Sequence, residues 1–224
     1  MATDPNDSLV ISYLTLRRTL GVLGISLPFI LAVGGLIVFG IGLQTSISDY
    51  YHTGMGDVFV GIIVAIGLFL ASYTGYPKTG HNDPPISDNA AGNIASVCAV
   101  GLALFPTTPD IAATAQDKTI GLIHLIFSAI FFLALAYFSY FLFTRTDPTR
   151  KPTDRKLRRN RVYRVCGVVI LAALVLIVVE WVLPEATRQA LSPYKPVFWL
   201  ESLAVVAFGA SWLVKGKTLW RDRA

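Results

Sequence analysis

Acidic, aromatic and imidazole side chains are concentrated in one short stretch of the chain, residues 46–57 (SISDYYHTGMGD). The stretch carries Asp49, His52 and Asp57 between two long apolar runs, at a place where a short turn would suffice. Carboxylates and imidazole are the side chains that transfer protons and bind metal ions in proteins. We interpret the stretch as the border of a polar, outward-facing pocket.

Three further ionisable residues, His124, Glu180 and Glu201, are expected at the same depth in the membrane as this stretch. Glu180 and Glu201 lie inside apolar runs (LIVVEWVL and VFWLESLAV), where a carboxylate costs several kcal/mol unless it is paired or hydrated. Such residues face a bundle interior or a water-filled cavity. A helical rise of about 1.5 Å per residue, counted from the other end of each helix, places the four candidates in the outer quarter of a membrane about 30 Å thick. These candidates are Asp57, His124, Glu180 and Glu201.

Two histidines and one or two carboxylates could form a zinc site, and zinc lowers the pKa of a bound water to about 7. We predict His52, His124 and Glu201 as metal ligands, with Asp57 as the alternative to Glu201. Glu180 is then the general base. The further candidates are Asp57 and Ser48 for catalysis, and Asp49, Tyr50, Tyr51 and Trp181 for substrate binding.

Purely structural roles would explain the same residues. Asp57 could cap the helix that follows it, and Ser128 could bond only its own backbone. Glu180 could pair with Arg188 or Lys195, which would leave an ion pair and no active site. No H-E-x-x-H or similar compact metal motif is present in the sequence.

The elements that must position these residues are membrane helices. The 224 residues are 54% hydrophobic and only 15% charged, whereas soluble domains carry about 25% charged residues. Cys98 and Cys166 lack metal-type spacing and are predicted to be buried thiols. We predict a single all-α domain, residues 1–224, formed by a polytopic bundle of six transmembrane helices. Their approximate spans are 19–43, 56–74, 89–106, 119–144, 162–183 and 196–215.

Lysine and arginine predict the orientation of this bundle, because cytoplasmic loops retain them. With the N-terminus inside, sixteen of them fall on the inner side, and only Lys118, Arg188 and Lys195 fall outside. Both termini are therefore predicted to be cytoplasmic. The net charge of +5 then reflects topology and does not indicate nucleic acid as a partner. The basic segment 154–164 is either a topology anchor or a contact for anionic lipid.

Two short motifs resemble known families. Ser48-x-x-x-His52 resembles the serine and histidine pair of the alkaline ceramidase and adiponectin-receptor superfamily, which implies a multi-helix membrane hydrolase with an intramembrane zinc. The resemblance departs at residues 196–215, which contain no histidine. Ile47-Ser48-Asp49, followed by Val58 to Gly61, is similar to small six-helix bacterial membrane proteins of unknown function and distantly to DRAM and Frag-type proteins. That similarity implies a multi-pass protein of the bacterial cytoplasmic membrane.

Three classes of function follow from these observations. The first is a metal-dependent lipid hydrolase or lipid-modifying enzyme, with zinc as its cofactor. The second is a non-catalytic module that binds a lipid or a small solute, and the third is an accessory or structural subunit of a membrane complex. Expected partners are membrane lipids and other membrane subunits. No nucleotide motif or phosphate-binding glycine loop is present, so neither nucleotide nor nucleic acid is expected.

Overall fold

The structure, a computed structural model, describes residues 5–76, 83–146 and 151–216, with side chains from residue 13 onward. Within these residues the chain is helical and contains no strand, as the sequence predicts. Two 3-10 turns, one π-helical turn and one short α-helix join or extend six longer helices. The long helices are α1 (Pro5–Phe39), α2 (Gly56–Ala71), α3 (Asp88–Leu104), α4 (Ala115–Tyr137), α5 (Asp154–Val182) and α7 (Pro196–Lys215). The short elements are η1 (Ser48–His52), η2 (Phe138–Leu142, the π-helical turn), α6 (Glu185–Leu191) and η3 (Ser192–Tyr194).

Four of the long helices, α1, α4 with η2, α5 and α7, are long and apolar enough to cross a membrane. The other two are shorter, since α2 and α3 have 16 and 17 residues and extend over about 24 and 26 Å. A hydrocarbon core is about 30 Å thick. The structure thus confirms an all-α chain with several apolar helices, and the count of six crossings remains a prediction.

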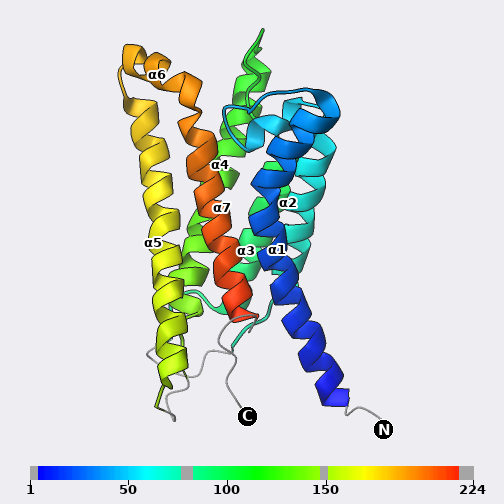
Figure 1. Ribbon diagram of the computed structural model, residues 1–224, viewed down its shortest axis with the longest axis vertical. Helices are drawn as coiled ribbons and strands as arrows, with labels where there is room; N and C mark the ends of the chain where they lie inside the picture. Colours follow the sequence, from blue (N-terminus) through cyan, green and yellow to red (C-terminus); the bar gives the residue numbers. More distant parts are fainter. Residues whose placement is uncertain (1–4, 77–82, 147–150, 217–224) are drawn as a thin grey trace.

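The six long helices form a ring in the order α1, α2, α3, α4, α5, α7, and α7 returns to α1. The start of α1 and the end of α7 lie at the same end of the bundle (Figure 1). Of the four long apolar helices, α7 is the most enclosed. In α7, 56% of the apolar 18-residue segment is buried, compared with 28% or less in the other three helices. Its place between α1 and α5 explains this burial.

Glycines allow the closest helix contacts in this ring. A methyl group added at Gly209 in α7 would lie 2.6 Å from the carbonyl oxygen of Gly21 in α1. One added at Gly92 in α3 would lie 2.7 Å from the carbonyl oxygen of Leu70 in α2. Small residues let helix backbones approach in this way where lipid supplies no hydrophobic force between helices.

The helices begin where local hydrogen bonds favour them. Thr114 and Asp117 form a reciprocal capping box at the start of α4, with the Thr114 hydroxyl accepting from the Asp117 amide. Thr153 and Ser87 cap α5 and α3 with their hydroxyl oxygens. These capping residues mark where α3, α4 and α5 begin, at the ends of the bundle.

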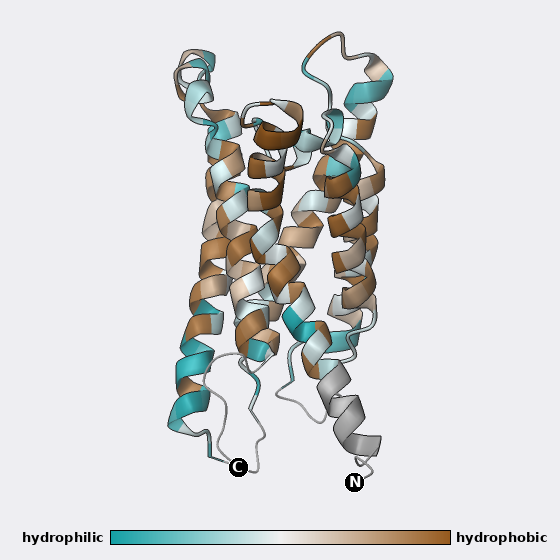
Figure 2. Ribbon diagram, turned by 45° about the vertical axis from the view of Figure 1, so that its right-hand side comes forward, coloured by the Kyte–Doolittle hydropathy of each residue, from teal (hydrophilic) through white to brown (hydrophobic). Residues whose placement is uncertain are grey.

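Hydrophilic residues gather at the two ends of the bundle, and hydrophobic residues occupy the middle (Figure 2). We call one end the basic end, because Arg17, Arg145, Arg159 and Lys215 lie there. The opposite end, formed by residues 40–55, 105–114 and 183–195, is the η1 end. The buried cations thus gather at the basic end, whereas the η1 end holds few Lys and Arg residues.

Candidate functional site

The stretch 46–57 forms η1 and the turn after it, and α7 holds its start. The Glu201 carboxylate accepts a hydrogen bond from the Ile47 amide at 2.7 Å. Next to it, the Phe198 amide donates to the Thr45 carbonyl at 2.9 Å. The amides at the start of a helical turn have no partner within the turn, so a carboxylate there satisfies them. Glu201, predicted as a metal ligand, therefore anchors η1 to α7.

Thr107, in the loop after α3, holds the other side of η1. Its hydroxyl donates to the Asp49 carboxylate at 3.0 Å, and its carbonyl lies 2.8 Å from His52 Nε2. Because a carbonyl oxygen only accepts, Nε2 of His52 carries the proton in this contact. Asp49 and His52 thus join η1 to the loop 105–114 at the rim of the η1 end.

His124 is buried in α4 and faces the end of α3. Its Nδ1 lies 2.7 Å from the Phe105 carbonyl and 3.0 Å from the Leu102 carbonyl. Both partners are acceptors, so Nδ1 carries the proton and shares it between them. The last carbonyls of a helix have no partner within that helix, and His124 supplies one for α3.

The three predicted metal ligands are therefore held by three separate sets of backbone groups. His52 contacts Thr107, His124 contacts the end of α3, and Glu201 contacts η1. Within the described parts of the chain, no three His, Cys, Asp or Glu side chains are grouped so that they could hold a metal ion. Zinc at this end remains a prediction from residue types, and no contact between the three side chains supports it.

The predicted substrate-binding residues do not share one surface. Tyr50 is fully buried against Phe198, and this burial raises the pKa of its hydroxyl. Tyr51 is half-buried with its ring edge-on to His52, and Trp181 is 44% exposed near the end of α5. Asp49 alone forms a polar contact at the rim.

Two of the predicted catalytic residues, Glu180 and Asp57, lie at the ends of helices. Asp57 is exposed in the first turn of α2, where a negative charge favours the helix dipole, but Met55 occupies the cap position and no side chain caps the helix. Glu180 is half-buried near the end of α5, but Arg188 pairs with Glu185 and Lys195 donates to Thr45. The ion pair of Glu180 with Arg188 or Lys195 is therefore not formed.

Ser48, the third predicted catalytic residue, lines a small cavity beneath η1 together with Ser128 and Glu201. The remaining walls are apolar, and the cavity has a volume of about 20 Å³. That is enough for one water molecule, which needs about 10–15 Å³ by the same measure. The Ser128 hydroxyl has no hydrogen-bond partner, contrary to the alternative that it bonds its own backbone. The cavity can hold one bridging water between Ser128 and Glu201.

A far larger groove lies between α3, α4, η2 and α5, with a volume of about 530 Å³. Its only polar side-chain groups are two tyrosine hydroxyls, and that of Tyr137 is engaged with the Ile86 backbone, donating to O at 3.1 Å and accepting from N at 3.0 Å. The groove is not evident in the sequence, because it is formed where large apolar side chains of three helices surround small ones. The lining residues are Ile86, Ala91, Ile94, Ile130, Leu133, Ala134, Ala136, Tyr137, Tyr140, Phe141 and Leu171.

Comparisons with known protein families, with characterised proteins and with solved structures found no match to this chain. The resemblances based on Ser48-x-x-x-His52 and on Ile47-Ser48-Asp49 therefore remain sequence-based predictions.

Proposed function

We propose that this chain is a multi-pass membrane protein that binds the acyl chain of a lipid in the groove between α3, α4 and α5. The observation that carries the proposal is the groove itself, which has about 530 Å³ and an almost wholly apolar lining. Binding sites for small molecules have volumes of about 300–1,000 Å³ and predominantly apolar walls. The proposal is one of binding, in line with the non-catalytic class of function.

The position of the groove favours an acyl chain over a polar solute. Along the helical segment formed by α4 and η2, Leu133 lies about 22 Å from Lys118 and about 14 Å from Leu142, so it lies well inside the apolar part of this segment. The surrounding medium at that depth is hydrocarbon. A polar solute would lose its hydrogen bonds to water there and would find the Tyr137 hydroxyl already occupied by Ile86.

The η1 end favours a structural role over hydrolysis. His52, His124 and Glu201 each satisfy backbone groups of a different segment. A hydrolytic zinc site needs three protein ligands around one open position, and no three such side chains are grouped within the described residues. We therefore do not assign the lipid a reaction at this end.

The distribution of Lys and Arg supports cytoplasmic placement of the basic end, with six crossings and both termini inside. The shorter helices α2 and α3 then cross by local thinning of the bilayer, at a modest cost. The expected location is a cell membrane.

Photo-crosslinking tests the groove directly. The protein is reconstituted in phosphatidylcholine vesicles that contain a trace of phosphatidylcholine with a diazirine on one acyl chain, and labelled peptides are quantified by mass spectrometry. We expect labelling near Leu133 to exceed labelling near the exposed Val175 of α5 several-fold. Equal labelling of all exposed apolar faces would mean that the groove holds only ordinary bilayer lipid, and the proposal would fail.

A matched pair of variants localises the effect on α3. Ile94→Trp fills the groove, whereas Val97→Trp places the same ring one turn away, on an exposed position outside the groove. We expect Ile94→Trp to remove the excess labelling and Val97→Trp to preserve it. Loss of labelling in both variants would point to a general disturbance of α3 instead.

A further inference from the structure

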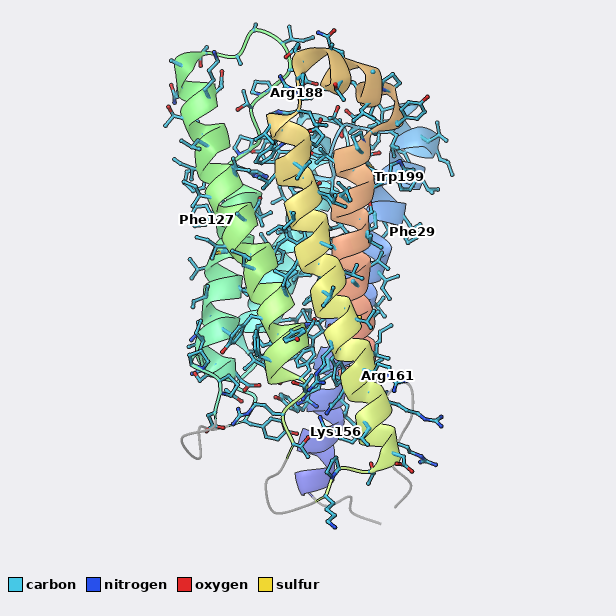
Figure 3. The ribbon with its side chains drawn as sticks, turned by 90° about the vertical axis from the view of Figure 1, so that its left-hand side faces the viewer. Phe29, Phe127, Lys156, Arg161, Arg188 and Trp199 are labelled. Atoms are coloured by element: carbon cyan, nitrogen blue, oxygen red, sulfur yellow. The ribbon has the colours of Figure 1, made fainter. Side chains whose placement is uncertain are left out.

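Four cationic side chains from three helices converge at the basic end. Arg17 belongs to α1, Lys215 ends α7, and Lys156 and Arg159 lie in the first turns of α5. Arg17, Arg159 and Lys215 are each at least nine-tenths buried. Arg17, Lys156 and Arg159 all lie within electrostatic range of Lys215, together with one carboxylate, Asp88. Figure 3 shows Lys156 at this end of the bundle, together with Arg161 on the same helix.

The nearby carboxylates are already committed to another cation. Arg145 bonds Asp88 through Nη1 at 2.9 Å and Asp83 through Nη2 at 2.6 Å. In the described part of the chain, neither Arg17 nor Lys215 forms an ion pair with a carboxylate. Burying a cation without an anion is costly, so these two side chains require other compensation.

The contacts of Arg17 and Lys215 compensate them only in part. The Arg17 guanidinium lies 4.1 Å from the Tyr13 ring centroid, and its Nη1 approaches the Lys215 carbonyl at 3.5 Å. Lys215 Nζ lies 5.0 Å from the ring of Phe143 and 5.1 Å from that of Tyr76. Aromatic rings and helix carbonyls stabilise a cation but leave its full charge in place. Arg17 Nε is buried without any hydrogen-bond partner.

We propose that Arg17 and Lys215, supported by Lys156 and Arg159, form a binding site for a phosphate group. A guanidinium provides a fork of N–H donors that matches phosphate oxygens, and an ammonium adds a compact charge. The unpartnered Nε of Arg17 is one donor of this fork. The bound phosphate would supply Arg17 and Lys215 with an anion, since no carboxylate of the described residues forms an ion pair with either side chain.

The phosphate could belong to a lipid headgroup or be free in solution, since both present the same oxygens. Arg17 lies two residues before Thr19, where the uncharged run of α1 begins. Lys215 is the last residue of the apolar helix α7, so the site lies at the level of the membrane interface. It is formed by α1, α5 and α7, whereas the acyl-chain groove is lined mainly by α3 and α4. The two proposals can therefore fail independently.

Two binding measurements on the full-length protein in detergent distinguish the sources. Inorganic phosphate is titrated by calorimetry at constant ionic strength with chloride as the balancing anion. Retention of phosphatidylglycerol is compared with that of diacylglycerol, which lacks the phosphate, by native mass spectrometry. Retention of phosphatidylglycerol alone would assign the site to a headgroup, and binding of inorganic phosphate alone would assign it to a soluble ion. Binding of both would show that the site accepts either source.

The variants Arg17→Gln and Lys215→Met each remove one buried cation, and Arg161→Gln removes an exposed cation of α5 as the matched control. We expect each buried-site variant to weaken phosphate-dependent binding about tenfold or more, the effect of one charge-assisted hydrogen bond. Arg161→Gln should change it less than about twofold, because exposed charges act weakly.

Circular dichroism checks that each variant is folded. If both buried-site variants fail to fold, Lys156→Gln, at a half-buried position, replaces them and is expected to weaken binding several-fold. The inference is overturned if the wild type binds neither probe saturably. It is also overturned if the folded site variants weaken binding no more than Arg161→Gln does. Ile94→Trp should leave phosphate binding unchanged, which separates this site from the groove.

Discussion

The ion-pair cluster around Arg145 gives the sharpest prediction for stability. Its guanidinium joins three segments by bonding Asp88 at the start of α3, Asp83 before it, and the Tyr76 carbonyl after α2 at 3.3 Å. Asp88 is fully buried and also accepts from the Tyr73 hydroxyl at 3.3 Å. Arg145→Met would leave this carboxylate buried without its cation.

The magnitude follows from the burial of the partners. Arg145 and Asp83 have side chains only 14% and 13% exposed, and that of Asp88 is 0% exposed, so solvent screens the cluster weakly. Removing one member of a buried pair costs about 3–5 kcal/mol. For a chain of this size each kcal/mol lowers the melting temperature by roughly 2–4 °C, so we expect a decrease on the order of 10 °C. Arg145→Lys should be intermediate, because one ammonium cannot match the two-pronged contact of a guanidinium.

Thermal unfolding of the detergent-solubilised protein, followed by circular dichroism, measures these effects. The double variant Arg145→Met with Asp88→Asn supplies the control, since neutralising the orphaned carboxylate should recover part of the lost stability. The reasoning is wrong if Arg145→Met costs less than about 1 kcal/mol, the value typical of an exposed pair. It is also wrong if the double variant is as unstable as the sum of the single ones.

Three further predictions concern packing, helix ends and pH. Gly209→Ala should destabilise the contact of α1 with α7 by about 1–3 kcal/mol, whereas Gly61→Ala, which meets no atom within 4 Å, should be neutral or stabilising in the same unfolding assay. His124→Leu should cost about 1–3 kcal/mol, because it leaves the last carbonyls of α3 without a donor. Burial raises the pKa of Tyr73 well above 10.0, so the folded state favours the neutral phenol and stability should be lost as pH rises above about 10. Tyr73→Phe should reduce this loss.

Each of these predictions has an outcome that contradicts it. Equal stabilities of the two glycine variants would mean that α1 and α7 are not in close contact at Gly209. An unchanged unfolding temperature in His124→Leu would mean that water satisfies the same carbonyls. A stability curve at alkaline pH that is identical with and without the Tyr73 hydroxyl would place the titrating group elsewhere.

Helix positions were predictable because they depend on neighbouring residues. The span predicted at 196–215 coincides with α7, and that at 56–74 differs from α2 only by three residues at its end. The distribution of Lys and Arg also predicted that one end of the bundle is more basic than the other. The sequence nevertheless placed Arg17 and Lys215 among topology signals, and gave no sign that they are buried.

At the candidate site, the sequence predicted the depth of the polar residues but not their hydrogen-bond partners. The structure places His52, His124 and Glu201 at the η1 end, but residue type and depth did not identify their hydrogen-bond partners. Those partners are backbone groups, and Glu201 lies 154 residues from its partner Ile47. A polar side chain inside an apolar run needs a hydrogen-bond partner, but many groups that are distant in the sequence can serve equally well.

By itself, then, the sequence determined an all-helical chain with several apolar helices, because composition and local capping decide those features. Only the tertiary structure decided which groups meet. The packing of α3, α4 and α5 creates the groove, and the order of helices in the ring brings Arg17 and Lys215 together. The physical reason is that hydrophobicity acts locally along the chain, whereas cavities and hydrogen bonds depend on the register between helices that are distant in sequence.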